Sequence, residues 1–427
     1  MLFSSLSSWT TASAYACTAT LPSDGNGTEG DPYQLSTPDE LLWFKNNGSN
    51  KYFKLINDID MNACPWGNGR AEAFSGSFDG QGHVIDGLKI DGDSEFVGFF
   101  HEIAIGGVVK NLGLVNVDVE SQFDPNSASS TCPGTEGKTG ALAATSYGSI
   151  EASFASGRVE AWYTGSTNCR PMYTGGLVGW GLYSSVTSDS WFSGLVKGGS
   201  FTGGLFGRLD NLLEQSFAVG AVKDGTYAGG VVGKTANNGS QKTIINTYSN
   251  SDVDGLSAGG LVGQMGQTNI LRSQAFGSAN GYYHAGGLIA MFDAAGQIYD
   301  SISNVDVTVD INTACFAGGI AGYTDSMQSY EPEIFRSIAT GNVSQKDSTC
   351  SNPDLLGPIV SGGFEDKNLP QASFYIDAVP NGNTLGSQST LSGLQSIATY
   401  DNADPAWTSG KIEAVSDCST PSTTANL

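Results

Sequence analysis

Positive charge is scarce in this sequence. Its 427 residues include 19 Lys plus Arg against 42 Asp plus Glu, giving a formal net charge of -23, and there are only three histidines. A field of this sign repels nucleic acid and anionic membranes, so neither is an expected partner. The sequence also lacks any apolar run of 18 or more residues, and it therefore offers no candidate for a membrane-spanning helix.

Glycine is abundant, with 58 residues, and much of it belongs to a repeat. The pattern is two glycines, two apolar residues and often a third glycine, as in "YTGGLVGW" at 173–180. One such loop would suit a phosphate, but repetition indicates a scaffold. Copies lie at 201–208, 227–234, 257–264, 284–291 and 316–323, with looser ones at 96–103, 139–144 and 361–366.

A second block alternates with the first, and its small and apolar residues recur at every second position, which indicates β-strands. An apolar residue, such as Val108 or Ile150, precedes most blocks by three positions and is expected to turn into the core. Each repeat supplies two or three strands, too few to bury a face unless repeats stack. The pattern predicts an all-β, right-handed parallel β-helix. Its tight corners are expected to need the paired glycines, because a Cβ or a negative φ would obstruct the bend. The blocks lie at 111–117, 153–159, 190–196, 216–222, 247–253, 273–279, 301–307 and 337–343.

The array is expected to lie between two caps. Residues 1–16 end in an A-x-A pattern typical of a signal-peptide remnant. Thr37, Pro38 and Glu40 form a capping box and predict a short helix within the N-terminal cap. Irregular loops are expected at 118–139 and 160–172. The predicted segments are the N-terminal cap at 17–73, the β-solenoid at 74–365, the C-terminal cap at 366–418 and a disordered tail at 419–427.

The seven cysteines include no CxxC motif and no Cys/His cluster, so a zinc site is not expected. Disulfides are the better interpretation, and they indicate an oxidising compartment. The cysteines of two predicted pairs, Cys132–Cys169 and Cys315–Cys350, are about one repeat apart, so each disulfide would join loops of adjacent turns. Cys418 remains free or available for an intermolecular bond. The predicted pairs are Cys17–Cys64, Cys132–Cys169 and Cys315–Cys350.

The segments "FSGSFDGQGHVIDGLKI" at 74–90 and "FVGFFHEIAIGGVVKNLGLVNVDV" at 96–119, followed by the "GGLVG" blocks, resemble the GLUG-repeat proteins of bacteria over about residues 31–400. The resemblance implies a right-handed parallel β-helix that is secreted or displayed on the cell surface. Such regions often belong to adhesins, or accompany metallopeptidases that cleave immunoglobulin A1. The family motif is a scaffold, so it implies no catalytic residue.

Signals for enzyme chemistry are weak. In "HEIAI" at 101–105, Ile105 occupies the position where a zinc peptidase needs its second histidine. His83, near Asp79, is interpreted as a turn residue bonded to backbone. We predict no catalytic residue, no metal site and no cofactor, with structural calcium at acidic pairs such as Asp58 and Asp60 as an alternative.

Aromatic residues give the most specific prediction of a site. One per repeat falls at the second position of the strand block, and these predict a ladder that either forms a structural layer or stacks on sugars. Four more aromatics, in the first half of the array, are the predicted ligand-binding residues. The ladder comprises Phe154, Trp191, Phe217 and Tyr248, and the predicted site comprises Trp162, Tyr163, Trp180 and Tyr183.

These observations favour a non-enzymatic, adhesin-like binding or structural module outside the cell. Its expected partner is a surface glycan, neutral because of the charge of -23, or a protein. Self-association through the solenoid or through Cys418 would instead build a surface filament. The alternative is a polysaccharide lyase or hydrolase with a β-helix fold, which would need carboxylates converging in one groove.

Overall fold

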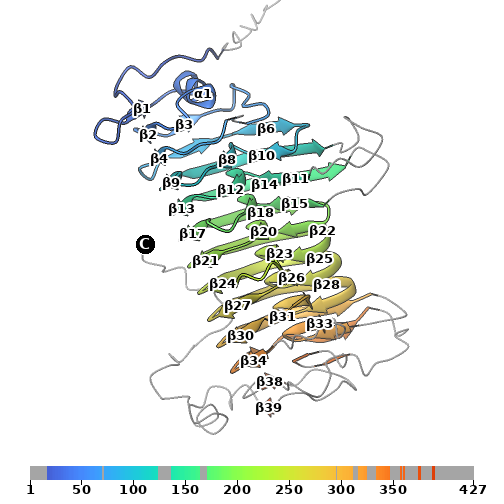
Figure 1. Ribbon diagram of the computed structural model, residues 1–427. Coiled ribbons are helices and arrows are strands. Elements are labelled where there is room, and N and C mark those ends of the chain that lie inside the picture. The colour runs from blue at the N-terminus through green and yellow to red at the C-terminus, as the bar shows by residue number, and fades with distance from the viewer. Residues whose placement is uncertain are drawn as a thin grey trace, which may run out of the picture.

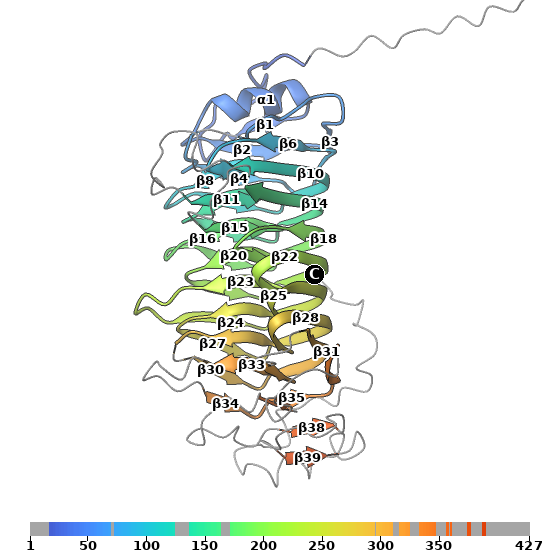
Figure 2. The ribbon, with the colours of Figure 1, turned by 90° about the vertical axis from the view of Figure 1, so that its right-hand side faces the viewer.

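The computed structural model describes residues 17–69, 72–123, 136–163, 171–294, 296–310, 316–324 and 333–346, and the short segments 356–357, 359–360, 374–376 and 387–389. Within them, strands of successive turns pair in parallel and stack below one N-terminal helix (Figures 1 and 2). The predicted parallel β-helix is confirmed. No helix in the described segments is long and apolar enough to cross a membrane.

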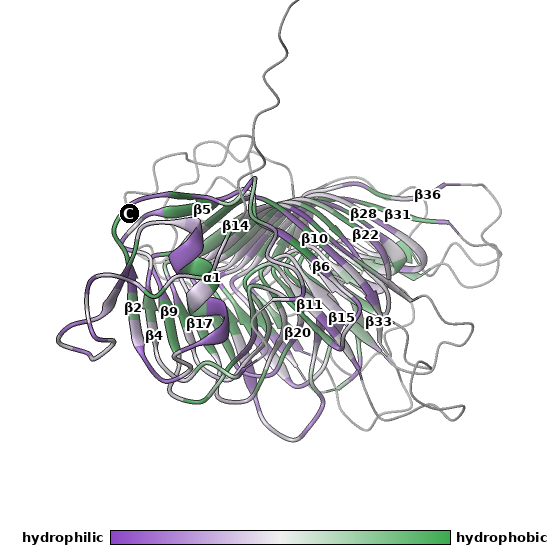
Figure 3. Cartoon of the chain, turned by 90° about the horizontal axis from the view of Figure 1, so that it is seen from above, coloured by the Kyte–Doolittle hydropathy of each residue, from purple (hydrophilic) through white to green (hydrophobic). Residues whose placement is uncertain are grey.

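From β4 onward, successive turns of the chain contribute strands to three sheets, which surround a common core when seen along the axis (Figure 3). The first sheet has eleven strands, in the order β1 (Tyr33–Leu35), β2 (Tyr52–Leu55), β4 (Ser77–Asp79), β9 (Val108–Lys110), β13 (Ser149–Glu151), β17 (Val186–Ser188), β21 (Leu212–Glu214), β24 (Lys242–Ile245), β27 (Thr268–Leu271), β30 (Gln297–Tyr299) and β34 (Glu333–Phe335).

The second sheet has twenty strands and bends into two arms, so that a long strand such as β22 runs through both. Its members are β3 (Ile59–Asp60), β5 (Val84–Asp86), β6 (Lys89–Gly92), β7 (Phe96–Val97), β10 (Gly113–Phe123), β11 (Gly137–Gly140), β14 (Phe154–Tyr163), β15 (Met172–Gly175), β18 (Trp191–Lys197), β19 (Phe201–Gly203), β22 (Phe217–Gly229), β25 (Tyr248–Gly259), β28 (Gln274–Gly286), β31 (Ile302–Val309), β32 (Phe316–Gly318), β35 (Ile338–Ala339), β36 (Val343–Gln345), β37 (Leu356–Gly357), β38 (Phe374–Ile376) and β39 (Ser387–Ser389).

The third sheet has eight strands and returns the chain to the first sheet. Its members are β8 (Phe100–Ile103), β12 (Ala143–Ser146), β16 (Val178–Gly181), β20 (Phe206–Leu209), β23 (Val232–Thr235), β26 (Val262–Met265), β29 (Ile289–Phe292) and β33 (Ala321–Thr324).

The N-terminal cap closes the core with helix α1 (Pro38–Asn46), which begins at the predicted capping box of Thr37 and Glu40. The helix buries Phe44 against Phe53, with ring centroids 4.7 Å apart. Cys17 and Cys64 form a disulfide across the cap, the pair suggested by the sequence. Because β1 and β2 already pair with β4, the cap continues the first sheet rather than forming a separate unit.

Successive side chains of each strand point alternately into the core and away from it. Ile150 and its counterparts on the first sheet are buried as predicted, with one correction. On β9, Val109 rather than Val108 aligns with Ile150 and enters the core. The alternation of inward and outward residues on this strand is shifted by one position relative to the other repeats. The valines that end the strand blocks, such as Val159 and Val196, are also buried.

The corner between the first and second sheets depends on non-glycine residues, which the sequence did not reveal. One residue in each turn has a φ of 45–51°, in the left-handed region. A buried serine or threonine follows it in most turns. Ser190 is typical: its Oγ donates to the Ser188 carbonyl at 2.7 Å and accepts from the Ser153 amide at 3.2 Å. The left-handed residues are Asn111, Ala152, Asp189, Gln215, Asn246, Arg272, Asp300 and Arg336.

The repeated glycines shape the other corner, between the second and third sheets, but not through positive φ. None of the paired glycines from 175 to 287 has a φ in that region. They are needed because backbones touch. A Cβ on Gly203 would lie 2.0 Å from the Phe206 carbonyl oxygen, and one on Gly204 would lie 2.1 Å from that of Gly230. The prediction of glycine corners was right about steric room and wrong about φ.

Several predictions need correction or fall outside the described segments. The loop expected at 118–139 is in part strand, because β10 continues to Phe123 and β11 begins at Gly137; similarly, β14 continues to Tyr163. The looser glycine copy at 361–366, residues 1–16 and all but two strands of 366–427 lie outside the described residues. So do Cys132, Cys169, Cys315, Cys350 and Cys418.

Candidate functional site

The four aromatics of the predicted site do not form one cluster. Trp162 lies near the end of strand β14 in the second sheet, and 36% of its surface is exposed. The side chain of Tyr163 lies outside the described part of the structure. Trp180 lies on β16 of the third sheet. Tyr183 is 63% exposed beyond that strand and packs edge-on against Tyr147, at 5.7 Å between centroids. No described contact joins Trp162, Trp180 and Tyr183, because they come from different sheets or opposite strand ends.

The predicted aromatic ladder is confirmed, and its geometry argues for a structural role. Phe154, Trp191, Phe217 and Tyr248 align in register on adjacent strands. Their ring planes differ by only 5–8°, and successive centroids are 4.3–5.5 Å apart. Each ring face therefore lies against the next ring, which leaves mainly ring edges toward solvent. A sugar stacks on a ring face, so this ladder is a poor sugar platform.

A different surface brings aromatic and polar side chains together, at the outer side of the glycine corner. There the third glycine of most repeats lets the third sheet approach the second; a Cβ on Gly207 would be 2.4 Å from the Thr174 amide nitrogen. Two columns of outward side chains thus lie side by side, and we call them the corner face. The second-sheet column is Lys138, Tyr173, Phe201, Tyr227, Ser257, His284 and Phe316; the third-sheet column is Thr145, Trp180, Arg208, Lys234, Gln264, Met291 and Tyr323.

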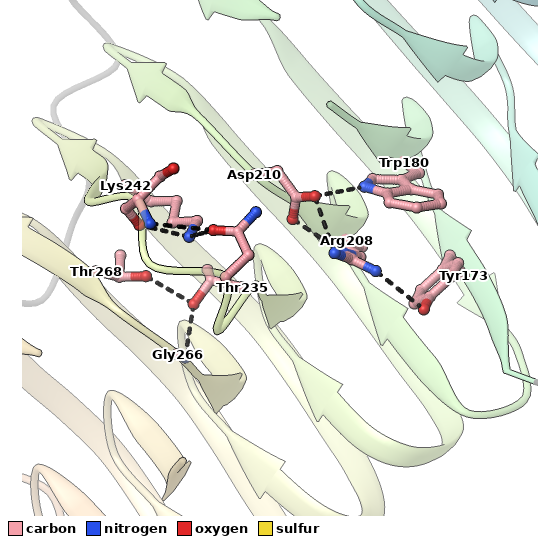
Figure 4. A network of polar contacts seen from close by, with 10 residues as sticks. Tyr173, Trp180, Arg208, Asp210, Thr235, Lys242, Gly266 and Thr268 are labelled. Atoms are coloured by element: carbon pink, nitrogen blue, oxygen red, sulfur yellow. Dashed lines mark hydrogen bonds and ion pairs between the residues drawn. The ribbon is translucent and has the colours of Figure 1, made fainter. Parts of the chain in front are cut away.

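The upper part of the corner face is a closed polar network (Figure 4). Arg208 holds both carboxylate oxygens of Asp210, at 2.9 and 3.0 Å, and donates to the Tyr173 hydroxyl at 3.3 Å. The Trp180 indole donates to the same carboxylate at 3.0 Å, and the guanidinium carbon lies 4.1 Å from the Trp180 ring centroid. Burial raises the pKa of Tyr173. Trp180 is thus anchored within the fold.

The middle of the corner face is not closed in this way. Lys234 lies 4.7 Å from the Phe201 ring centroid and has no carboxylate within 4.0 Å among the described residues. Burial lowers the pKa of its ammonium group. One strand further along the same column, Gln264 is only 6% exposed, and its Oε1 has no hydrogen-bond partner in the described structure. A buried acceptor without a donor is costly, and among the nine buried side-chain nitrogen and oxygen atoms without a partner in the described structure this is the one on the corner face.

Further along the face, Ser257 and His284 form a serine–histidine pair, with Oγ 2.9 Å from Nδ1. The His284 ring stacks on Tyr323, with centroids 4.6 Å apart. Burial lowers the pKa of His284 to about 4. An imidazole with so low a pKa is a weak base, so the pair is poorly suited to activate the serine near neutral pH.

The other residues considered for chemistry have structural partners. His101 lies on strand β8 and bonds the Asn68 carbonyl, as expected for a strand residue rather than a zinc ligand. His83 bonds Asp58 at 3.1 Å rather than backbone, which corrects its predicted partner. In the described segments, no three His, Cys, Asp or Glu side chains are grouped to hold a metal ion, so the calcium alternative gains no support.

The fold and the corner face define a β-helical module with a lateral surface of aligned side chains. No family model matches the chain. A stretch of 128 residues is 34% identical to halomucin from Haloquadratum walsbyi; the match covers 26% of this chain and 1% of halomucin, so the chain spans a very small part of that relative.

Two solved structures are also similar. A Bacteroides ovatus protein described as a candidate immunoglobulin A1 protease aligns with a TM-score of 0.36 and 17% identity, over 89% of this chain and 90% of its own. An IgA1 protease aligns with a TM-score of 0.35 and 17% identity, over 81% of this chain and 21% of its own.

Proposed function

We propose that this protein is a non-enzymatic, adhesin-like module outside the cell that binds a glycan on its lateral corner face. The observation that supports it is the middle of that face, where a cation without an ion pair adjoins a buried amide oxygen without a donor. Polar groups left in this state are ready to bind hydroxyl and charged groups of a ligand. The GLUG-repeat membership expected from the sequence is part of this proposal.

The rest of the structure supports a rigid scaffold around that face. Serines, aromatic rings and ion pairs on one turn contact the equivalent residues of the next turn. Arg158, for example, binds Asp118 and Glu120 of the preceding turn. The disulfide and the net charge of -23 suit an oxidising, extracellular environment. The local similarity to halomucin is consistent with this location.

The carboxylate at the centre of the polar network, Asp210, is not available for hydrolysis or elimination. Polysaccharide-cleaving β-helices need carboxylates that are available to the substrate. At the corner face, Asp210 is 4% exposed and both its oxygens bond Arg208, with Trp180 as a third donor. A carboxylate held in this way serves structure rather than proton transfer.

The test is binding of the full chain to immobilised glycans and to cells, followed by assay of the same glycans for new reducing or unsaturated ends. We expect binding that is lost after periodate oxidation of the sugars, with no new ends. Binding that survives periodate but not protease would point to a protein partner and contradict the proposal. New chain ends would replace it with the polysaccharide-active enzyme.

A further inference from the structure

We propose that the corner face recognises a sugar residue carrying one negative charge, held between Lys234 and Gln264. This inference rests on the proposed function and specifies its ligand. The sequence favoured a neutral glycan because the whole chain is acidic, whereas the structure places a cation without an ion pair at the centre of the candidate site.

Lys234 differs from the other cations of the corner face. Lys138 bonds Glu95, and Arg208 is bidentate to Asp210. Lys234 has only a ring beside it and, among the described residues, no carboxylate within 4.0 Å. Its burial removes water from the ammonium group, and the acidic groups around it act on it without a direct ion pair, so an anionic ligand would provide a partner in contact.

Gln264 supplies the second contact. It is the register partner of Lys234 on the adjacent strand, and adjacent strands are about 4.8 Å apart, so both side chains can contact one sugar residue. Its Oε1 is an acceptor without a donor, and a sugar hydroxyl is a donor. Because this amide is nearly buried, we expect its side chain to turn outward when the sugar binds.

The neighbouring column offers an aromatic surface at the same level. Tyr173, Phe201 and Tyr227 stack with centroids 5.4 and 5.5 Å apart. The next position is Ser257, so the stack ends at Tyr227, whose side chain is partly exposed. Tyr227 thus has no ring beneath it in the column and can pack against the apolar face of a sugar.

The arrangement favours one charge over a polyanion. Lys234 is the one cation of the corner face that lacks an ion pair among the described residues, and its surroundings include the acidic groups Asp293, Asp210 and Glu136. A chain with many charges would meet this acidic field and the net charge of -23. A single acidic residue within an otherwise neutral glycan avoids most of that repulsion.

The experiment uses calorimetric titration of the full chain with three matched probes: a glucose oligosaccharide, the same oligosaccharide ending in glucuronic acid, and the same ending in a 6-sulfated glucose. We expect the charged probes to bind at least about tenfold more tightly than the neutral one, the effect of a single well-placed ion pair. The two charged arms distinguish a carboxylate from a sulfate ligand. Equal binding of charged and neutral probes would overturn the inference but leave the proposed function standing; no glycan binding would overturn both.

Variants locate the site. Lys234→Met keeps an unbranched side chain beside Phe201 but removes the charge, and it should abolish the preference for charged probes. Gln264→Leu should weaken the binding of all three probes. Lys223→Met is the matched control, because Lys223 pairs with Asp254 on the other arm of the second sheet and should change nothing. An unchanged preference in Lys234→Met, with circular dichroism like that of the parent, would also overturn the inference. The preference of the parent chain is measured independently of how the variants fold.

Discussion

Protonation of His284 should destabilise the fold, and the effect is large enough to measure. The ring is mostly buried between Ser257 and Tyr323, and burial lowers its pKa from 6.5 to about 4. The unfolded chain therefore takes up the proton first as the pH falls. Stability is complete above about pH 6.5, is lost as the pH falls toward about 4, and then levels off.

The magnitude follows from that shift. Between about pH 7.5 and about pH 4.5, a histidine with pKa values of 6.5 unfolded and about 4 folded should cost about 2.5 kcal/mol of unfolding free energy. Carboxylates also titrate in this range, so the comparison is with His284→Gln, in which Gln can keep a hydrogen bond to Ser257 and the carboxylates are unchanged.

The assay is urea denaturation of both proteins at the two pH values, followed by circular dichroism of the β-structure. The parent should lose about 2.5 kcal/mol more than His284→Gln on acidification. If the two proteins lose the same stability, His284 is not held neutral by burial, and the argument from its environment is refuted.

Three further predictions concern the scaffold. Gly203→Ala should prevent native folding, because its Cβ would lie 2.0 Å from a carbonyl oxygen, whereas Gly30→Ala, with no atom within 4 Å, should fold normally by circular dichroism. Trp191→Ala should cost about 3 kcal/mol in urea denaturation, because it removes a half-buried ring stacked on both sides, and a loss below about 1 kcal/mol would contradict this. Cys64→Ser should cost about 4 kcal/mol by releasing a link across 47 residues, and equal stability of reduced and oxidised parent would contradict that account.

Local patterns were sufficient to predict the stacking. Period-two alternation identified the strands, because a half-buried strand must place every second residue inside. Equivalent positions in successive repeats then align when turns stack, and this predicted the ladder of Phe154, Trp191, Phe217 and Tyr248. The capping box around Thr37 likewise identified the helix, because its hydrogen bonds join residues only three apart.

The left-handed corner was not visible in the sequence. Its residues include Asn and Asp, which tolerate positive φ, but also Ala152 and Arg272, which do so poorly. These positions adopt the conformation because the sheets on either side fix it. No local preference of the residues themselves would have identified them.

The sequence alone therefore determined the repeat, the strands and the in-register ladders, because each depends on residue spacing along the chain. Only the tertiary structure decided which ladders meet. Tyr173 contacts Arg208 from 35 residues later, across a corner where glycine backbones touch, and Lys234 lies beside Phe201 in the same way. The offset of one turn across that corner is set by the packing of whole sheets, and no local pattern records it. For that reason the sequence predicted binding aromatics on separate sheets, whereas the structure brings Lys234 beside Phe201 and Gln264.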